Sequence, residues 1–162
     1  MKDKRVLVVG LGRFGTSLCH ALWEVGAETI VIDESASPVD KVKDQVTHAA
    51  VGDGTDPRVL DALGVAQVDV AVVTFGHDFE SSVLAVAALA KAAVPLIIAR
   101  AETRRKADVL RAVGASRVLE IEWEMGRRLA QDLVSPVASD LLDLAETYRV
   151  TPWLAQGRLI GK

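Results

Sequence analysis

The sequence has almost no cysteine, no long hydrophobic run and no excess of basic charge. Cys19 is the only cysteine among 162 residues, so an internal disulfide is excluded, as is usual in a reducing compartment. The apolar runs are strand-sized, whereas a helix needs about 20 apolar residues to cross a bilayer, so we expect no membrane span. A formal net charge of -3 gives no basic surface for nucleic acid. The first residues lack the apolar region of a secretory signal, and we therefore expect a cytoplasmic protein.

What is present is a regular alternation of apolar strands and amphipathic helices. Half of the residues are hydrophobic, which suffices for one core in a chain of this length. The expected strands cover residues 6–9, 29–32, 49–51, 68–73, 95–99 and 117–119. The expected helices cover residues 14–24, a short segment that Pro38 starts, a segment that begins at Thr55-Asp56-Pro57, and residues 78–93, 104–113 and 123–133. This alternation predicts an α/β fold with a Rossmann-like, doubly wound, parallel six-stranded sheet and a short C-terminal extension.

Three glycines follow the first expected strand at the spacing of a phosphate-binding loop. Gly10 permits a tight turn, Gly12 lets the backbone approach a diphosphate, and Gly15 lets the next helix pack on its strand. The free N–H groups at the start of that helix then face the phosphates. Asp33 follows about 20 residues later, where such folds place an acid against ribose hydroxyls. The pattern predicts nucleotide binding, and its alternative is a set of glycines that serves helix packing alone.

Further candidate residues stand at the ends of the other strands, because sheets of this kind bind ligands at the carboxyl ends of their strands. Asp53, preceded by Gly52, is expected at the adenine edge, and a simple turn role is its alternative. Arg100 ends the fifth strand, where a cation can meet phosphate or close on a neighbouring subunit. The fourth strand ends in Thr74, Phe75 and Gly76.

Several segments together resemble a known family. They are GLGRFG at residues 10–15, VID at 31–33, GDGTD at 52–56, VLRAVGASRVL at 109–119, and Glu122 followed by Met125 and Gly126. In this order they resemble the N-terminal RCK (regulator of potassium conductance) domain of Trk/Ktr-type potassium uptake systems. We accordingly expect residues 1–135 to form an RCK nucleotide-binding domain and residues 136–162 to be a linker toward a C-terminal regulatory domain that is missing. The expectation is a truncated chain, with a naturally short subunit as the alternative.

The resemblance implies a regulatory subunit rather than an enzyme. Domains of this family pair, assemble into rings (an octamer is expected here) and gate a membrane potassium channel or transporter from its cytoplasmic face. The Arg-Phe pair within the glycine loop is similar to the Ktr branch, which implies ATP or ADP as the ligand. The Trk branch implies NAD or NADH, which is the alternative.

The resemblance and the strand-end rule together define a set of candidate site residues. Arg13 is expected to reach a terminal phosphate through paired charge-assisted hydrogen bonds, and a solvated side chain is the alternative. For Asp33 the alternative is a cap or turn role. Glu122 resembles a glutamate that helps to hold Mg²⁺ or Ca²⁺ at the dimer interface, and a plain surface acid is the alternative. The predicted nucleotide contacts are Gly10, Leu11, Gly12, Arg13, Phe14, Gly15, Asp33, Gly52, Asp53, Thr74, Phe75, Gly76 and Arg100.

Two rival functions belong to other classes. One is a remnant of an NAD-dependent oxidoreductase, but too little chain follows residue 135 to build a substrate pocket and a proton-transfer residue. The other is an assembly domain whose cleft binds nothing. Thermal shifts with nucleotides distinguish a regulatory domain from an assembly domain whose cleft binds nothing. Hydride transfer to or from a substrate would indicate an oxidoreductase.

Overall fold

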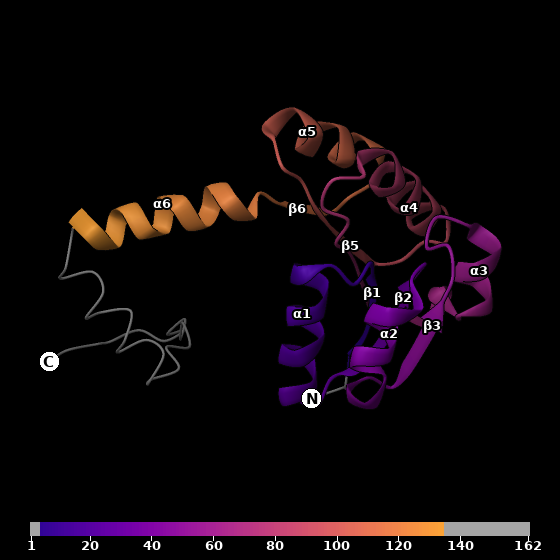
Figure 1. Ribbon diagram of the computed structural model, residues 1–162. Helices are drawn as coiled ribbons and strands as arrows, with labels where there is room; N and C mark the ends of the chain where they lie inside the picture. The colour runs from indigo at the N-terminus through magenta and orange to yellow at the C-terminus, as the bar shows by residue number, and fades with distance from the viewer. Residues whose placement is uncertain (1–3, 135–162) are drawn as a thin grey trace, which may run out of the picture. The chain divides into compact units, whose positions relative to one another are not determined.

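The computed structural model describes residues 4–134 and contains a parallel sheet of six strands (Figure 1). The sheet order is β3-β2-β1-β4-β5-β6, and every pairing is parallel. The strands are β1 (Arg5–Val9), β2 (Glu28–Asp33), β3 (His48–Val51), β4 (Val70–Val73), β5 (Leu96–Arg100) and β6 (Arg117–Leu119). The predicted doubly wound sheet is confirmed. Its strand order reverses at β1 and β4, and sheets of this kind bind ligands beyond the carboxyl ends of the strands at that point.

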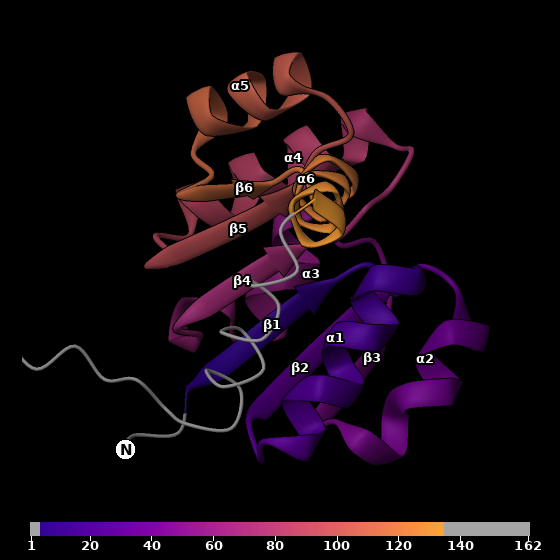
Figure 2. The same ribbon diagram turned by 90° about the vertical axis from the view of Figure 1, so that its left-hand side faces the viewer.

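Helices cover both faces of the sheet (Figure 2). They are α1 (Arg13–Glu24), α2 (Ala36–Val42), α3 (Pro57–Ala62), α4 (Phe79–Lys91), α5 (Arg104–Val113) and α6 (Ile121–Val134), with 3₁₀ turns η1 (Lys43–Gln45) and η2 (Val65–Gln67). The α1 and α2 helices pack on one apolar cluster of the sheet, and α3, α4 and α5 pack on the other.

Alternation along β1 explains the two clusters. Val6 and Val8 belong to the cluster under α1, whereas Leu7 and Val9 belong to the cluster on the opposite face. Successive strand residues point to opposite faces, so a strand buried on both faces must be apolar throughout. Cys19 packs as a small apolar residue in the α1 cluster, and burial raises the pKa of its thiol to about 11.

Some predicted boundaries were wrong by two residues. The α2 helix begins at Ala36 rather than at Pro38, because the first three N–H groups of a helix have no helical partner and a proline is tolerated there. The β4 strand begins at Val70 rather than at Val68, which follows the 3₁₀ turn η2. The α6 helix begins at Ile121 rather than at Trp123.

Side-chain caps fix the helices that leave the carboxyl edge of the sheet. Asp56 accepts a hydrogen bond from the backbone N–H of Arg58 at 2.8 Å and caps α3. Asp78 accepts one from the backbone N–H of Ser81 at 3.0 Å and caps α4. Each cap satisfies a helix N–H that would otherwise lack a partner. The loops that precede these helices are thereby held in a defined conformation.

Residues up to Glu122 form one compact unit, and α6 continues from Trp123 into a second unit. Within α6 itself, Met125, Leu129 and Leu133 recur every four residues and form an apolar stripe. In the described part of the chain, no helix has both the length and the apolar character needed for a membrane crossing. The expected extension at residues 136–162 lies outside the described residues.

Candidate functional site

A cavity of about 470 Å³ lies at the carboxyl edge of the sheet. Its lining comes from the segments that follow β1, β4, β5 and β6, so the sheet topology brings together residues that are far apart in the sequence. We call it the edge cavity, and its volume is typical of small-ligand sites, which hold about 300–1,000 Å³. It is lined by Gly12, Arg13, Phe14, Thr74, Gly76, His77, Arg100, Glu102 and Glu122.

The three loop glycines have different roles in the structure. Gly10 has a φ of +95°, which favours glycine at this turn. A Cβ atom on Gly15 would stand 2.2 Å from the carbonyl oxygen of Gly10, so only glycine allows α1 to approach β1 this closely. A Cβ atom on Gly12 would meet nothing within 4 Å. Gly12 therefore borders open space in the edge cavity, whereas Gly10 and Gly15 shape the loop.

Thr74 and Phe75 brace the glycine loop from β4. The buried hydroxyl of Thr74 donates a hydrogen bond to the carbonyl oxygen of Gly10 at 2.6 Å. A Cβ atom on Gly10 would stand 3.1 Å from the Phe75 ring, and this ring also packs against the apolar cluster on the α4 face. Thr74 therefore holds the glycine loop and also lines the cavity, while Phe75 packs between the loop and the apolar cluster.

Asp33 fixes the glycine loop to β2. Its Oδ2 atom accepts a hydrogen bond from the backbone N–H of Leu11 at 2.7 Å. Its Oδ1 atom accepts one from the backbone N–H of Ser35 at 2.8 Å. Each carboxylate oxygen has two lone pairs, so the capacity to accept a ribose hydroxyl remains. The carboxylate thus has the turn role named as its alternative, and ribose binding stays a prediction.

The end of β3 lies apart from the edge cavity lining. Asp53 Oδ1 accepts hydrogen bonds from the backbone N–H and the hydroxyl of Thr55, at 2.7 and 2.6 Å. A Cβ atom on Gly52 would stand 3.3 Å from Val59 Cγ1, so the turn packs closely on α3. Of the predicted contacts, those outside the cavity lining are Gly10, Leu11, Gly15, Asp33, Gly52, Asp53 and Phe75.

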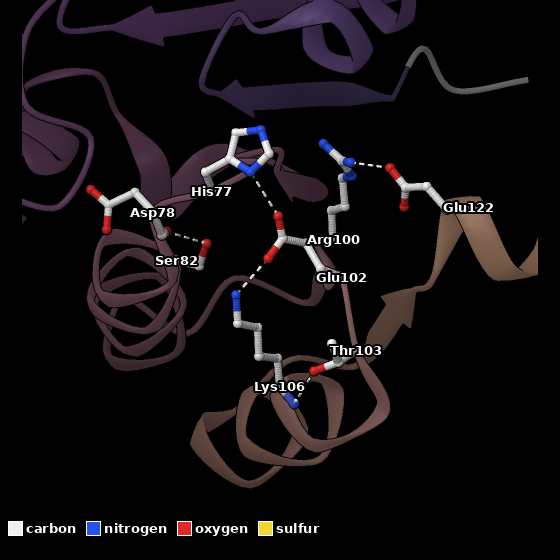
Figure 3. A network of polar contacts seen from close by, with 8 residues as sticks. All are labelled: His77, Asp78, Ser82, Arg100, Glu102, Thr103, Lys106 and Glu122. Atoms are coloured by element: carbon white, nitrogen blue, oxygen red, sulfur yellow. Dashed lines mark hydrogen bonds and ion pairs between the residues drawn. The ribbon is translucent and has the colours of Figure 1, made fainter.

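The two arginines of the edge cavity differ in their partners. Arg13 is exposed, and its guanidinium makes no hydrogen bond or ion pair with any of residues 4–134. Arg100 pairs through Nη2 with Oε1 of Glu122, as Figure 3 shows. A hydrogen bond from the backbone N–H of Glu122, followed by the contact with Arg100, holds the pKa of the Glu122 carboxyl below its usual value. Glu122 is therefore ionised at neutral pH.

His77 and Glu102 also line the edge cavity, although neither was among the predicted site residues. His77 Nδ1 lies 2.8 Å from Glu102 Oε1, and Lys106 Nζ donates to Glu102 Oε2 at 2.5 Å (Figure 3). The hydrogen bond from Lys106, more than that from His77, lowers the pKa of Glu102. Both residues follow strands at the carboxyl edge, so the strand-end rule that selected Thr74 and Arg100 could also have selected them.

The metal prediction concerns Glu122. Among the described residues, no group of three or more His, Cys, Asp or Glu side chains is arranged to hold a metal ion. The Glu122 carboxylate instead contacts the Arg100 guanidinium. A cation site here would need further oxygen ligands, such as ligand phosphates or residues of another subunit.

Comparison with known sequences gives one family and several relatives. The model of the TrkA-N domain family matches residues 6–121. The Ktr system potassium uptake protein C of Bacillus subtilis is 34% identical over 158 residues, which cover 98% of this chain and 72% of that protein. The Ktr system potassium uptake protein A of the same organism is 30% identical over 162 residues, covering 100% and 73%.

Similar solved structures carry nucleotides. The GsuK channel bound to NAD has a TM-score of 0.68 at 20% identity, with 79% of this chain and 23% of that chain covered. GsuK bound to ADP has a TM-score of 0.70 at 19% identity, covering 83% and 35%. The AMP-bound Kef CTD of Shewanella denitrificans has a TM-score of 0.68 at 24% identity, covering 89% and 92%. At these identities the likeness shows a shared fold.

Proposed function

Because the chain belongs to the TrkA-N domain family, we propose that it is a cytoplasmic regulatory subunit of a potassium uptake system and that it binds an adenine nucleotide. Its ligand would control a membrane potassium channel or transporter. The Ktr potassium uptake proteins, similar over nearly the whole of this chain, support the transport partner. The domain division at residue 135 remains part of this proposal.

The edge cavity carries the nucleotide proposal. Open space at Gly12 adjoins the start of α1, where backbone N–H groups without helical partners favour an anion. Arg13 and Arg100 line the same cavity, and guanidinium groups bind phosphate oxygens through paired hydrogen bonds. Space, backbone donors and two cations at one edge of a parallel sheet suit a chain of phosphates.

ATP or ADP is the preferred ligand. ADP in one structural neighbour and AMP in another support an adenine nucleotide. We assign the terminal phosphate of ATP to Arg13, since this side chain has no competing partner among the described residues. A nucleotide gates a partner only through its different affinities for two conformations of the assembly. Arg13 would make the affinities for ATP and ADP differ, because only ATP has the terminal phosphate that this side chain binds.

NAD or NADH is the second candidate. The NAD-bound GsuK neighbour supports it, as does the position of Asp33 at the end of β2. A carboxylate at this position accepts ribose hydroxyls and repels a 2′-phosphate. If NAD(H) is the ligand, NADPH should bind much more weakly than NADH.

Assembly and metal binding complete the proposal. We infer dimers that assemble into a ring, an octamer in the expected form, beneath the transport subunit. Glu122 would contribute an oxygen to Mg²⁺ or Ca²⁺ at the dimer interface, together with ligand phosphates. No chemical step on the nucleotide is part of this function. A catalytic assay for hydride transfer with NADH would contradict the regulatory role if it gave turnover.

A thermal-shift panel tests the proposed function. The purified chain is heated with ATP, ADP, AMP, NADH or NADPH at equal concentration. A ligand present at 100 times its Kd stabilises the folded state by about 2.7 kcal/mol. We expect the largest rise in Tm with ATP or ADP and a smaller one with AMP. An unchanged Tm with all five ligands would contradict nucleotide binding, and a rise with NADH alone would favour the second candidate.

A further inference from the structure

The Arg100 side chain is largely enclosed, whereas that of its partner Glu122 is exposed. The Arg100 side chain is 17% exposed, whereas the Glu122 side chain is 64% exposed. A Cβ atom on Gly76 would stand 3.1 Å from Arg100 Nη1, so this guanidinium packs against the turn that follows β4. The Nε atom of Arg100 is enclosed and has no hydrogen-bond partner among the described residues. In this pair, the carboxylate is the side chain that can leave.

A carboxylate and a phosphate make the same demand on a guanidinium. Both accept N–H donors in a planar, charge-assisted arrangement. Arg100 and Glu122 also line the edge cavity together, so a ligand there would meet the guanidinium with its carboxylate already attached. Ion pairs with an exposed partner are weak, and a phosphate with its larger charge can replace the carboxylate.

We propose that Glu122 is an internal competitor that occupies Arg100 in the free protein and is displaced by a phosphate of the bound nucleotide. This rests on the proposed function and adds its regulation. Arg13 is the cation available from the start, and Arg100 becomes available only when the carboxylate leaves. In the absence of a divalent cation, Glu122 thereby lowers the affinity for the nucleotide.

The competition also gives the ligand a route to α6. Glu122 stands in the first turn of α6, and its lowered pKa keeps the carboxylate charged at neutral pH. Displacement breaks the side-chain link between β5 and this turn. Trp123 follows directly and is 70% exposed, which makes its indole a suitable reporter of the event.

Calorimetric titration with ADP tests the competition. The experiment uses Glu122→Gln without divalent cations, so that a cation-binding role of Glu122 does not enter. We expect Glu122→Gln to bind ADP about threefold tighter, because a weak ion pair no longer has to be broken. Glu120→Gln is the matched control. It removes the same charge two residues before Glu122, and Glu120 pairs with Arg104 rather than with Arg100. Equal gains in both variants would overturn the proposal.

A double-mutant cycle shows whether the gain passes through Arg100. In an Arg100→Gln background, we expect ADP to bind more weakly and Glu122→Gln to give no gain. A gain that persists without Arg100 would overturn the proposal. Wild-type binding of ADP with no gain in Glu122→Gln would overturn the competition alone. If neither form bound any nucleotide, the proposed function would fail as well.

Tryptophan fluorescence gives an independent readout. With Trp23 and Trp153 changed to Phe, the emission reports Trp123. We expect ADP to change this emission in the protein that retains Glu122, and Glu122→Gln to show the changed emission before ligand is added. The same emission from the two free proteins would overturn the proposed displacement, while equal Tm values would verify that both are folded.

Discussion

At the scale of single residues, the glycine loop separates into structural and binding positions. Gly15 faces the carbonyl oxygen of Gly10 across a gap too small for a Cβ atom, whereas Gly12 faces open space. The sequence spacing treats these glycines as one motif. Their surroundings show that one maintains the fold and the other leaves room for a ligand.

Alanine at Gly15 should therefore mainly lower stability, whereas alanine at Gly12 should mainly weaken nucleotide binding. Gly15→Ala should lower the free energy of unfolding by about 1–3 kcal/mol, the usual cost of overpacking. Gly12→Ala should cost no more than about 1 kcal/mol, because alanine is only a poorer N-cap than glycine. Its Cβ atom should nevertheless weaken nucleotide binding at least tenfold. Urea unfolding and ADP titration measure the two effects, and tight ADP binding by Gly12→Ala would contradict the assigned ligand position.

At the scale of elements, N-caps hold the loops that surround the edge cavity. Asp78 precedes α4 and caps it through both the hydroxyl and the backbone N–H of Ser81. The hydrogen bond from the Ser81 hydroxyl, followed by that from its backbone N–H, holds the pKa of Asp78 below its ordinary value of 3.8. The α4 cap is therefore coupled to pH.

The sign of this coupling predicts a loss of stability in acid. A group whose pKa is lowered by folding stabilises fully above its ordinary pKa, and this contribution disappears as the pH falls through the folded pKa. Asp78→Asn keeps an oxygen acceptor but does not titrate. We expect its Tm to fall less than that of the wild type when the pH is lowered from 5 to about 2. Asp61→Asn is the control, since the Asp61 carboxylate makes no hydrogen bond with the described residues, and it should follow the wild type.

The sequence predicted elements best where both ends carry a local signal. The α5 helix spans Arg104–Val113 as predicted, because Thr103 caps its start and Gly114, with a φ of +133°, ends it. No comparable signal separates Val68 from β4, since an apolar residue suits either a strand or the turn before it. The strand-end rule selected Thr74 and Arg100, and both line the edge cavity. Pairings such as Arg100 with Glu122 depend on how β5 and the start of α6 meet, which local sequence does not encode.

At the scale of the whole molecule, the sheet gathers its candidate residues at one edge. The carboxyl ends of β1, β4, β5 and β6, with the loops that follow them, all contribute to the edge cavity. The amino ends of the strands contribute none of its lining. A second depression of about 360 Å³ lies elsewhere, between α3 and α4, and includes Leu60, Lys91 and Ala92. The two locations make the ligand position testable without any substitution.

Hydrogen exchange should show nucleotide protection at the carboxyl edge alone. With saturating ADP, we expect slower exchange in residues 10–16, 74–78 and 100–103, because ligand contacts and reduced opening protect these amides. The amino-end turns at residues 46–47 and 68–69 serve as internal controls and should be unchanged. Protection around α3 instead would assign the ligand to the other depression.

A comparison of ATP and ADP binding by Arg13→Ala tests whether Arg13 distinguishes the two nucleotides by the terminal phosphate. Calorimetric titrations of the wild type, Arg13→Ala and Arg13→Lys give the affinity for each nucleotide. If Arg13 binds the terminal phosphate, Arg13→Ala should lose about 1.5–3 kcal/mol of ATP binding, roughly 10- to 150-fold, and far less of ADP binding. Arg13→Lys should recover part of the ATP affinity, since it keeps the charge but not the paired geometry. Equal losses for ATP and ADP would contradict the assignment of the terminal phosphate to Arg13.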